Sequence, residues 1–140
     1  MKFFIASDHA GFELKSRVIE MLHQMGHEVE DLGPQDSNRV DYPDFANLLC
    51  ENVLKNDKNF GILICGSGIG MSIAANRHKG IRAALCHEPY SAALSRAHND
   101  ANVLCLGARV VGDGLVEWIL KSFCDGVFEG GRHSARVEKL

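Results

Sequence analysis

The segment ICGSGIGMS, residues 64–72, combines a cysteine with a glycine-rich loop. A continuous apolar run, Phe60–Cys65, precedes the loop and predicts a buried strand, and a helix is expected to begin after Gly70. Backbone N–H groups in such a loop point outward and can stabilise an anion or a developing oxyanion. The same field favours the thiolate form of Cys65. The alternative interpretation is a glycine turn that only lets strand and helix pack closely.

The glycines of this loop match neither common nucleotide-binding motif. A dinucleotide fingerprint, G-x-G-x-x-G, would need its third glycine at Met71, and the pattern G-x-x-x-x-G-K-[ST] does not occur in the chain. A nicotinamide-dependent dehydrogenase and a nucleotide triphosphatase are therefore disfavoured.

Two pairs of polar residues stand where predicted elements end. Asp8 and His9 follow the first apolar strand, Lys2–Ser7, and His98 and Asn99 follow a predicted helix. A histidine can transfer protons near pH 7, so both pairs are candidates for acid–base chemistry. In isolation each pair also fits a structural role, because aspartate caps helix N-termini and histidine suits a helix C-terminus.

Basic residues near the C-terminus could hold a phosphate. Arg132 and Arg136 are four residues apart in EGGRHSARVEKL, so they share one face if this tail is helical. Two guanidinium groups on one face can bind a phosphate dianion through paired hydrogen bonds. Arg109, which follows a predicted strand, is a third candidate. A solvated basic terminus is the alternative interpretation.

The elements that must position these residues alternate between strand and helix. Strands are predicted at Lys2–Ser7, His27–Leu32, Phe60–Cys65, Ile81–Cys86 and Asn102–Leu106, and helices at Gly11–Met25, Pro43–Lys55, Met71–His78, Pro89–Ala97 and Gly112–Asp125. This order predicts one α/β domain over residues 1–140, a doubly wound, Rossmann-like, mostly parallel five-stranded sheet with helices on both faces. Ligands of such sheets bind beyond the carboxyl ends of the strands, where Asp8 and Cys65 are expected.

Composition argues against several classes of protein. The chain has 140 residues and a net charge of −3, which favours neither nucleic acid nor an anionic membrane as a partner. No apolar run approaches the roughly 20 residues that span a bilayer, and the N-terminus resembles a strand more than a signal peptide. A cytoplasmic protein is expected. Five cysteines without a C-x-x-C pair suggest no metal site or disulfide framework.

Together these motifs resemble one family. Over nearly its whole length the chain is similar to the type B ribose-5-phosphate isomerases, with galactose-6-phosphate isomerase subunits as close relatives. The segments that carry the resemblance are SDHAGFELK, DYPDFA, GILICGSGIGMSIAANRHKGIRAAL, EPYSAALSRAHNDANVLCLGARVVG and EGGRHSARV. The resemblance implies a cofactor-free aldose–ketose isomerase of the pentose phosphate pathway. It also implies a homodimer, or a dimer of dimers, whose sites are built from both subunits.

The resemblance assigns roles to individual residues. Cys65 matches the proton-abstracting base and His98 the ring-opening histidine, and Asp8 and Ser67 are expected to assist them. The positions that match sugar, phosphate or anion-hole contacts are Asp8, His9, Tyr42, Gly66, Ser67, Gly68, Ile69, Gly70, Asn99, Arg109, Arg132 and Arg136. The partner subunit is expected to supply His98, Asn99 and Arg109. Some relatives carry a carboxylate base at the position of Met71, which places this chain in the cysteine group.

Two other functions remain open at the level of sequence. One is the same reaction on a six-carbon sugar phosphate, such as allose 6-phosphate or galactose 6-phosphate. The other is a non-catalytic module that binds phosphate or a nucleotide, which would explain the loop and the arginines but not Cys65 together with His98.

Overall fold

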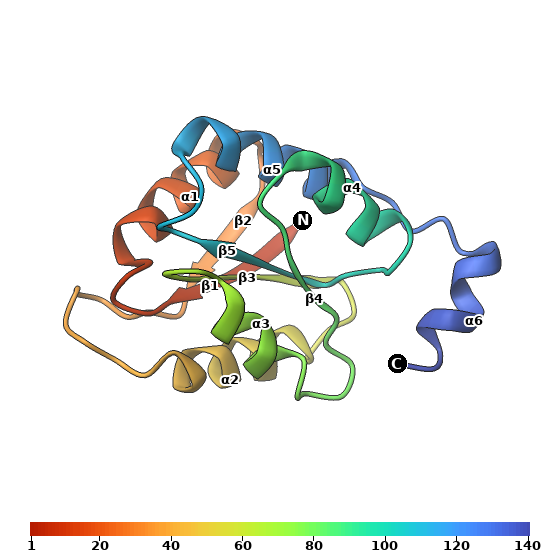
Figure 1. Cartoon of the computed structure of the whole chain (residues 1–140), viewed down its shortest axis with the longest axis horizontal. Helices are drawn as coiled ribbons and strands as arrows, with labels where there is room; N and C mark the ends of the chain where they lie inside the picture. The colour runs from red at the N-terminus through yellow and green to blue at the C-terminus, as the bar shows by residue number, and fades with distance from the viewer.

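The apolar runs of the sequence form a five-stranded sheet in which every pairing is parallel. The computed structural model describes residues 1–140 (Figure 1). The strands are β1 (Lys2–Ser7), β2 (Glu28–Asp31), β3 (Asn59–Cys65), β4 (Ala83–Leu85) and β5 (Val103–Gly107). Their order is β2-β1-β3-β5-β4. The predicted Rossmann-like α/β class is confirmed.

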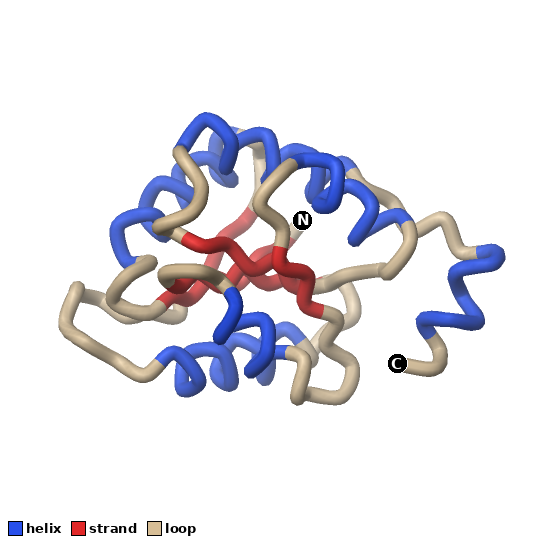
Figure 2. The backbone as a smooth tube through the Cα atoms, viewed as in Figure 1, coloured by secondary structure: helices blue, strands red, loops and turns tan.

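Helices cover both faces of the sheet, as a doubly wound fold requires. They are α1 (Phe12–Gln24), α2 (Tyr42–Val53), α3 (Ile69–Ala75), α4 (Pro89–Ala97), α5 (Asp113–Asp125) and a C-terminal pair, the 3₁₀ turn η1 (Gly131–His133) and α6 (Ser134–Val137). The helices α1, α4 and α5 lie on one face and α2 and α3 on the other (Figures 1 and 2). No helix is both long and apolar enough to cross a membrane.

The central strands are apolar throughout because both of their faces are buried. In β3, Ile62 and Ile64 point into the core under α1 and α5, and Leu63 points into the core above α2 and α3. All three side chains are inaccessible to solvent. Full burial of such a side chain stabilises the fold by roughly 1.5–3 kcal/mol. The sheet is thus a rigid base for the loops at its edges.

Several element boundaries differ from the predicted ones, most clearly those of β4 and of α3, which begins two residues earlier and ends three residues earlier than predicted. The strand predicted at Ile81–Cys86 is reduced to β4, because the backbone N–H of Arg82 bonds to the side chain of Asn102 rather than to a strand. In the first turns of α5, Val116 is buried, whereas Leu115 is 40% exposed.

The strand order changes direction between β1 and β3. The chain leaves β1 toward β2 on one side, and β3, β5 and β4 extend the sheet on the other. Such a reversal leaves a crevice beyond the carboxyl ends of the two adjacent strands, where ligands of doubly wound sheets bind. Asp8 follows β1, and Cys65 is the last residue of β3.

Candidate active site

The loop after β3 holds Cys65 in contact with a backbone donor. Cys65 is 5% exposed, and the N–H of Gly68 donates to its Sγ atom at 3.1 Å. A donor at this position stabilises negative charge on sulfur. Gly68 has φ of +77°, and a Cβ there would lie 2.9 Å from the carbonyl carbon of Leu106. The glycine is therefore needed for close packing and for the contact with the thiol.

Ser67 keeps its hydroxyl proton available within the same loop. The N–H of Ile69 donates to Oγ of Ser67 at 3.2 Å, so the hydroxyl oxygen acts there as an acceptor. The O–H of Ser67 can then donate to a bound anion. The loop therefore offers a hydroxyl donor next to the thiol, as the resemblance implies.

The other cysteines lie in surroundings that oppose ionisation. Burial raises the pKa of Cys50 to about 12 and that of Cys124 to about 11. It also raises the pKa of Cys86 and takes that of Cys105 well above its usual value. These four thiols therefore remain protonated near neutral pH.

The backbone donor at Cys65 and the raised pKa values of the other four thiols predict that alkylation will be selective for Cys65. At pH 8 only about one Cys124 in 10³ is a thiolate, so iodoacetamide should modify Cys65 first. Peptide mass spectrometry over time measures each site. Cys124 is the sharpest comparison, because it is partly exposed while Cys65 is buried. Alkylation of Cys124 at the rate of Cys65 would contradict the assignment.

Asp8 and His9 lie at the same edge of the sheet. One carboxylate oxygen of Asp8 accepts from the N–H of Gly11 at 3.1 Å, in the turn before α1, and the predicted cap of the helix itself does not form. The N–H of Val40 donates to Nδ1 of His9 at 3.3 Å. Because Nδ1 is an acceptor, a neutral His9 carries its proton on Nε2, where it can donate to an anion.

Tyr42 and Arg109 complete this first group. A Cβ placed on Gly70 would lie 2.6 Å from the ring of Tyr42, so the tyrosine lies directly against the loop. A Cβ on Gly66 would lie 3.0 Å from Nη1 of Arg109, and the N–H of Arg109 donates to the carbonyl of Gly66. Arg109 thus lies beside Cys65 of its own chain. The turn after β5 packs onto the turn after β3, which gives Arg109 this place in its own chain, and its supply by a partner subunit stays a prediction.

His98 and Asn99 belong to a second group, at the end of α4. The turn that presents them is held by Asp100, whose backbone is left-handed with φ of +48°. Its carboxylate accepts from Arg96 at 3.0 Å and from Arg82 at 3.2 Å. Asp100 is therefore the anchor of this turn.

The C-terminal tail packs against His98. The rings of His98 and His133 are stacked, with centroids 4.2 Å apart and planes 13° apart. Burial, followed by the neighbouring His98 and Arg132, lowers the pKa of His133, so His133 is neutral at pH 7. A cavity of about 400 Å³ lies here, lined in part by His98, Asn99, Arg132, His133 and Arg136. The two arginines therefore face the same space as His98.

Only one cluster has the composition of a metal site. Donor atoms of His98, Glu129 and His133 lie within 4.8 Å of one another. The two rings are stacked, however, and the in-plane lone pairs of nearly parallel rings do not converge on one ion. These residues therefore do not fit a shared metal ion as they are arranged.

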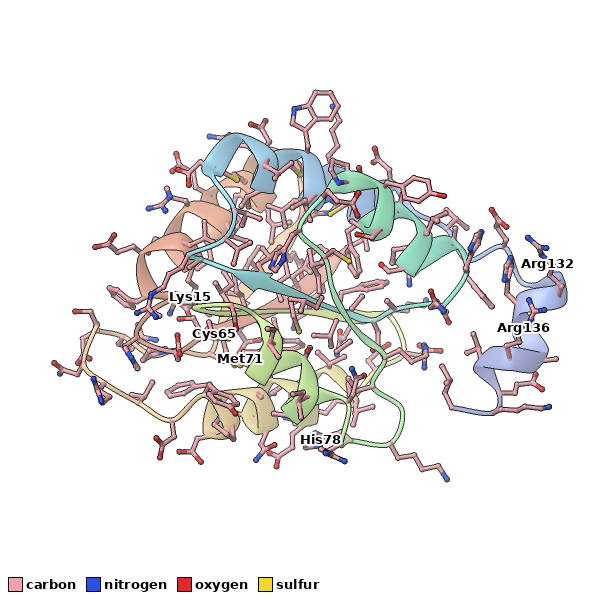
Figure 3. The ribbon with its side chains drawn as sticks, in the orientation of Figure 1. Lys15, Cys65, Met71, His78, Arg132 and Arg136 are labelled. Atoms are coloured by element: carbon pink, nitrogen blue, oxygen red, sulfur yellow. The ribbon has the colours of Figure 1, made fainter.

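The two groups lie at opposite edges of the sheet. Cys65, Asp8 and Arg109 follow the carboxyl ends of parallel strands, whereas α4 runs back across the sheet and ends in His98. Figure 3 places Cys65 on the far side of the molecule from Arg132 and Arg136. One chain therefore does not bring all the predicted site residues together.

Comparison with known proteins identifies the family. The family described as Ribose/Galactose Isomerase matches residues 3–140. The chain belongs to this family. Ribose-5-phosphate isomerase B of Escherichia coli is 48% identical over 139 residues, which cover 99% of this chain and 93% of that protein.

Solved structures of relatives agree closely. A ribose 5-phosphate isomerase of Thermotoga maritima is 52% identical, with a TM-score of 0.95 over 99% of this chain and 95% of that one. A ribose-5-phosphate isomerase B of Mycoplasma genitalium, solved with bound ribulose-5-phosphate, is 47% identical, with a TM-score of 0.94 over 99% and 92% of the two chains.

Met71 occupies the position at which some relatives are expected to carry a carboxylate base. Met71 is fully buried among the residues under the loop, so this position offers neither a carboxylate nor access to substrate. Two further polar groups, which had no predicted role, lie at the same end of the sheet as Cys65. The hydroxyl of Ser7 and Nε2 of His87 are buried without a hydrogen-bond partner. Their place at the carboxyl ends of β1 and β4 is the sequence signal that could have found them.

Proposed function

We propose that this member of the ribose/galactose isomerase family interconverts ribose 5-phosphate and ribulose 5-phosphate in the cytoplasm. The observation that carries the proposal is Cys65, a thiol with a backbone donor at 3.1 Å, at the carboxyl ends of the adjacent strands β1 and β3. Relatives that match over nearly the whole chain are named for this reaction. The relative with bound ribulose-5-phosphate supports the same substrate class.

The proposed reaction begins with ring opening. His98 moves a proton between the ring oxygen and O1 of the closed sugar, which gives the free aldehyde. The thiolate of Cys65 then takes the proton from C2, and negative charge develops on O1 of the enediolate. The loop and the hydroxyl of Ser67 stabilise this charge, and one such donor typically contributes about 3 kcal/mol in the transition state. The hydroxyl proton on O2 passes to O1, Cys65 returns its proton to C1, and the C2 carbonyl of the ketose forms.

Phosphate recognition is divided between the two groups of residues. His9, with its proton on Nε2, and Arg109 belong to the Cys65 group. Arg132 and Arg136 lie around the cavity beside His98. Binding energy from the phosphate orients the distant reacting carbons.

Because one chain holds the Cys65 group and the His98 group far apart, a complete site needs residues from two chains. We propose a homodimer in which His98, Asn99, Arg132 and Arg136 of one chain complete the Cys65 group of the other. The shape of the tail supports the proposal: α6 has no buried residue, and Leu140 is 79% exposed. The tail therefore projects from its own chain and is available to a second copy (Figure 1).

The proposed function is tested by following ribulose 5-phosphate formation from ribose 5-phosphate with a chelator present. We expect turnover with the chelator, and a higher kcat/KM than for allose 6-phosphate measured in parallel. Folded protein without activity on ribose 5-phosphate would overturn the proposal, and a preference for allose 6-phosphate would move it to six-carbon sugars.

Arg136→Ala should mainly raise KM. Removing a charge-assisted hydrogen bond costs about 1.5–3 kcal/mol, which corresponds to a roughly 10- to 100-fold higher KM for ribose 5-phosphate. Steady-state kinetics of the purified variant measure the effect. Arg17→Ala is the matched control, because Arg17 is an exposed arginine that pairs with Asp113 on the helical surface. An unchanged KM in Arg136→Ala would remove this residue from the phosphate site.

A further inference from the structure

Lys15 is a buried lysine that the proposed mechanism does not use. The residue is 1% exposed, and its Nζ atom donates to Oδ1 of Asp31 at 2.7 Å and to the carbonyl of Pro34 at 2.6 Å. A buried ammonium group is costly to fold around unless it is fully bonded. Replacement of such a pair by apolar residues is often neutral or stabilising. The core alone therefore does not explain why an ammonium group stands here.

The two acceptors show which part of the molecule Lys15 holds. Asp31 is the last residue of β2, and Pro34 lies in the loop that follows it. Oδ1 of Asp31 also accepts from the N–H of Gly33 at 2.8 Å, and the carbonyl of Gly33 accepts from the N–H of Ser7 at 3.1 Å. One ammonium group on α1 thus fixes the start of the 33–41 loop against the end of β1.

The far end of the same loop reaches the Cys65 group. The N–H of Val40 donates to Nδ1 of His9, which selects the tautomer with a proton on Nε2. The loop leads directly into Tyr42, the first residue of α2, whose ring lies against Gly70. Figure 3 shows Lys15 on the same side of the molecule as Cys65. The 33–41 loop therefore joins the Lys15 anchor at its start to the candidate site at its end.

We infer that Lys15 is a positioning residue for sugar phosphate binding. It does not touch the substrate: it holds the 33–41 loop, which in turn fixes the tautomer of His9 and the place of Tyr42. The inference rests on the proposed function for its kinetic consequence, but its structural consequence at His9 is independent of any activity.

Lys15→Met tests the inference, because methionine fills the same space without a donor. If the 33–41 loop keeps its wild-type position in only about a tenth of the Lys15→Met molecules, the KM for ribose 5-phosphate should rise about tenfold. The kcat should stay within about threefold, because Cys65 and His98 are unchanged. The ring-nitrogen NMR signals of His9, assigned by comparison with His9→Gln, should shift from a single tautomer to a mixture.

The control is Leu22→Ala, a cavity in the core two turns further along α1. It lowers the free energy of unfolding without touching the anchor, so KM and the His9 tautomer should stay as in the wild type. Lys15→Met/Asp31→Asn removes the unpaired carboxylate and should regain thermal stability, yet KM should remain raised because Pro34 still lacks its donor. If Lys15→Met does not fold, Lys15→Gln, which keeps an N–H donor on a shorter chain, replaces it.

The outcomes separate this inference from the proposed function. A single His9 tautomer in Lys15→Met, with the KM of the wild type, would overturn the positioning role. Raised KM in Leu22→Ala to the same degree would do so as well, because a loss of stability would then explain the effect. A wild type without isomerase activity would instead overturn the proposed function, and the His9 signals would still decide the role of Lys15.

Discussion

Cys65→Ala is expected to lower kcat by about 10⁴-fold or more, the upper range for loss of a positioned base. No other thiol can substitute, because Cys105 is fully buried and burial takes its pKa well above the usual value. Met71, six residues further on, offers no proton acceptor. Binding of ribose 5-phosphate should remain within about threefold, since the lost group acts only on the C2 proton.

Steady-state turnover and calorimetric binding of Cys65→Ala measure the two effects. Cys124→Ala is the matched control, because this partly exposed thiol has a pKa raised to about 11 and lies outside the candidate site. Its kcat should equal that of the wild type. Near-normal turnover in Cys65→Ala would show that the base lies elsewhere.

His98→Asn is expected to separate ring opening from isomerisation. The kcat/KM for ribose 5-phosphate, which is mostly a closed ring, should fall about 100-fold, the lower range for loss of an acid–base group. Erythrose 4-phosphate cannot close a five-membered ring, because its O4 carries the phosphate. We expect erythrose 4-phosphate to react more slowly than ribose 5-phosphate in the wild type. Its kcat/KM in His98→Asn should be nearly the same as in the wild type.

The stacked partner of His98 provides the control for this experiment. His133→Asn removes the neighbouring ring but leaves the proton-transfer group in place. It should reduce activity on both sugars to a similar and smaller extent. Equal losses on both sugars in His98→Asn itself would argue against a role in ring opening.

The sequence predicts the fold well where both faces of a strand are buried. β1, β3 and β5 lie within one residue of their predicted ranges, because their apolar runs have no competing interpretation. β4 is shorter than predicted because one side-chain contact, between Arg82 and Asn102, interrupts the ladder. The pattern of apolar residues does not predict such a side-chain contact.

The site could be predicted only in part for a related reason. Cys65 and Asp8 follow predicted strands, so their shared edge follows from the parallel order. The stacking of His133 on His98 depends on the path of the tail, and the buried contacts of Lys15 depend on the 33–41 loop. Long-range contacts between irregular segments leave no periodic signal in a sequence.

In the proposed homodimer, Cys65 of one chain and His98 of the other form one active site. The most direct test of this shared site mixes Cys65→Ala and His98→Asn protein, exchanges subunits under mild denaturant and assays ribose 5-phosphate. Each mixed dimer would hold one intact site and one site with both changes, so random exchange should restore about a quarter of wild-type activity. Activity that stays at the average of the two separate variants, with mixed dimers demonstrated by mass spectrometry, would contradict a shared site.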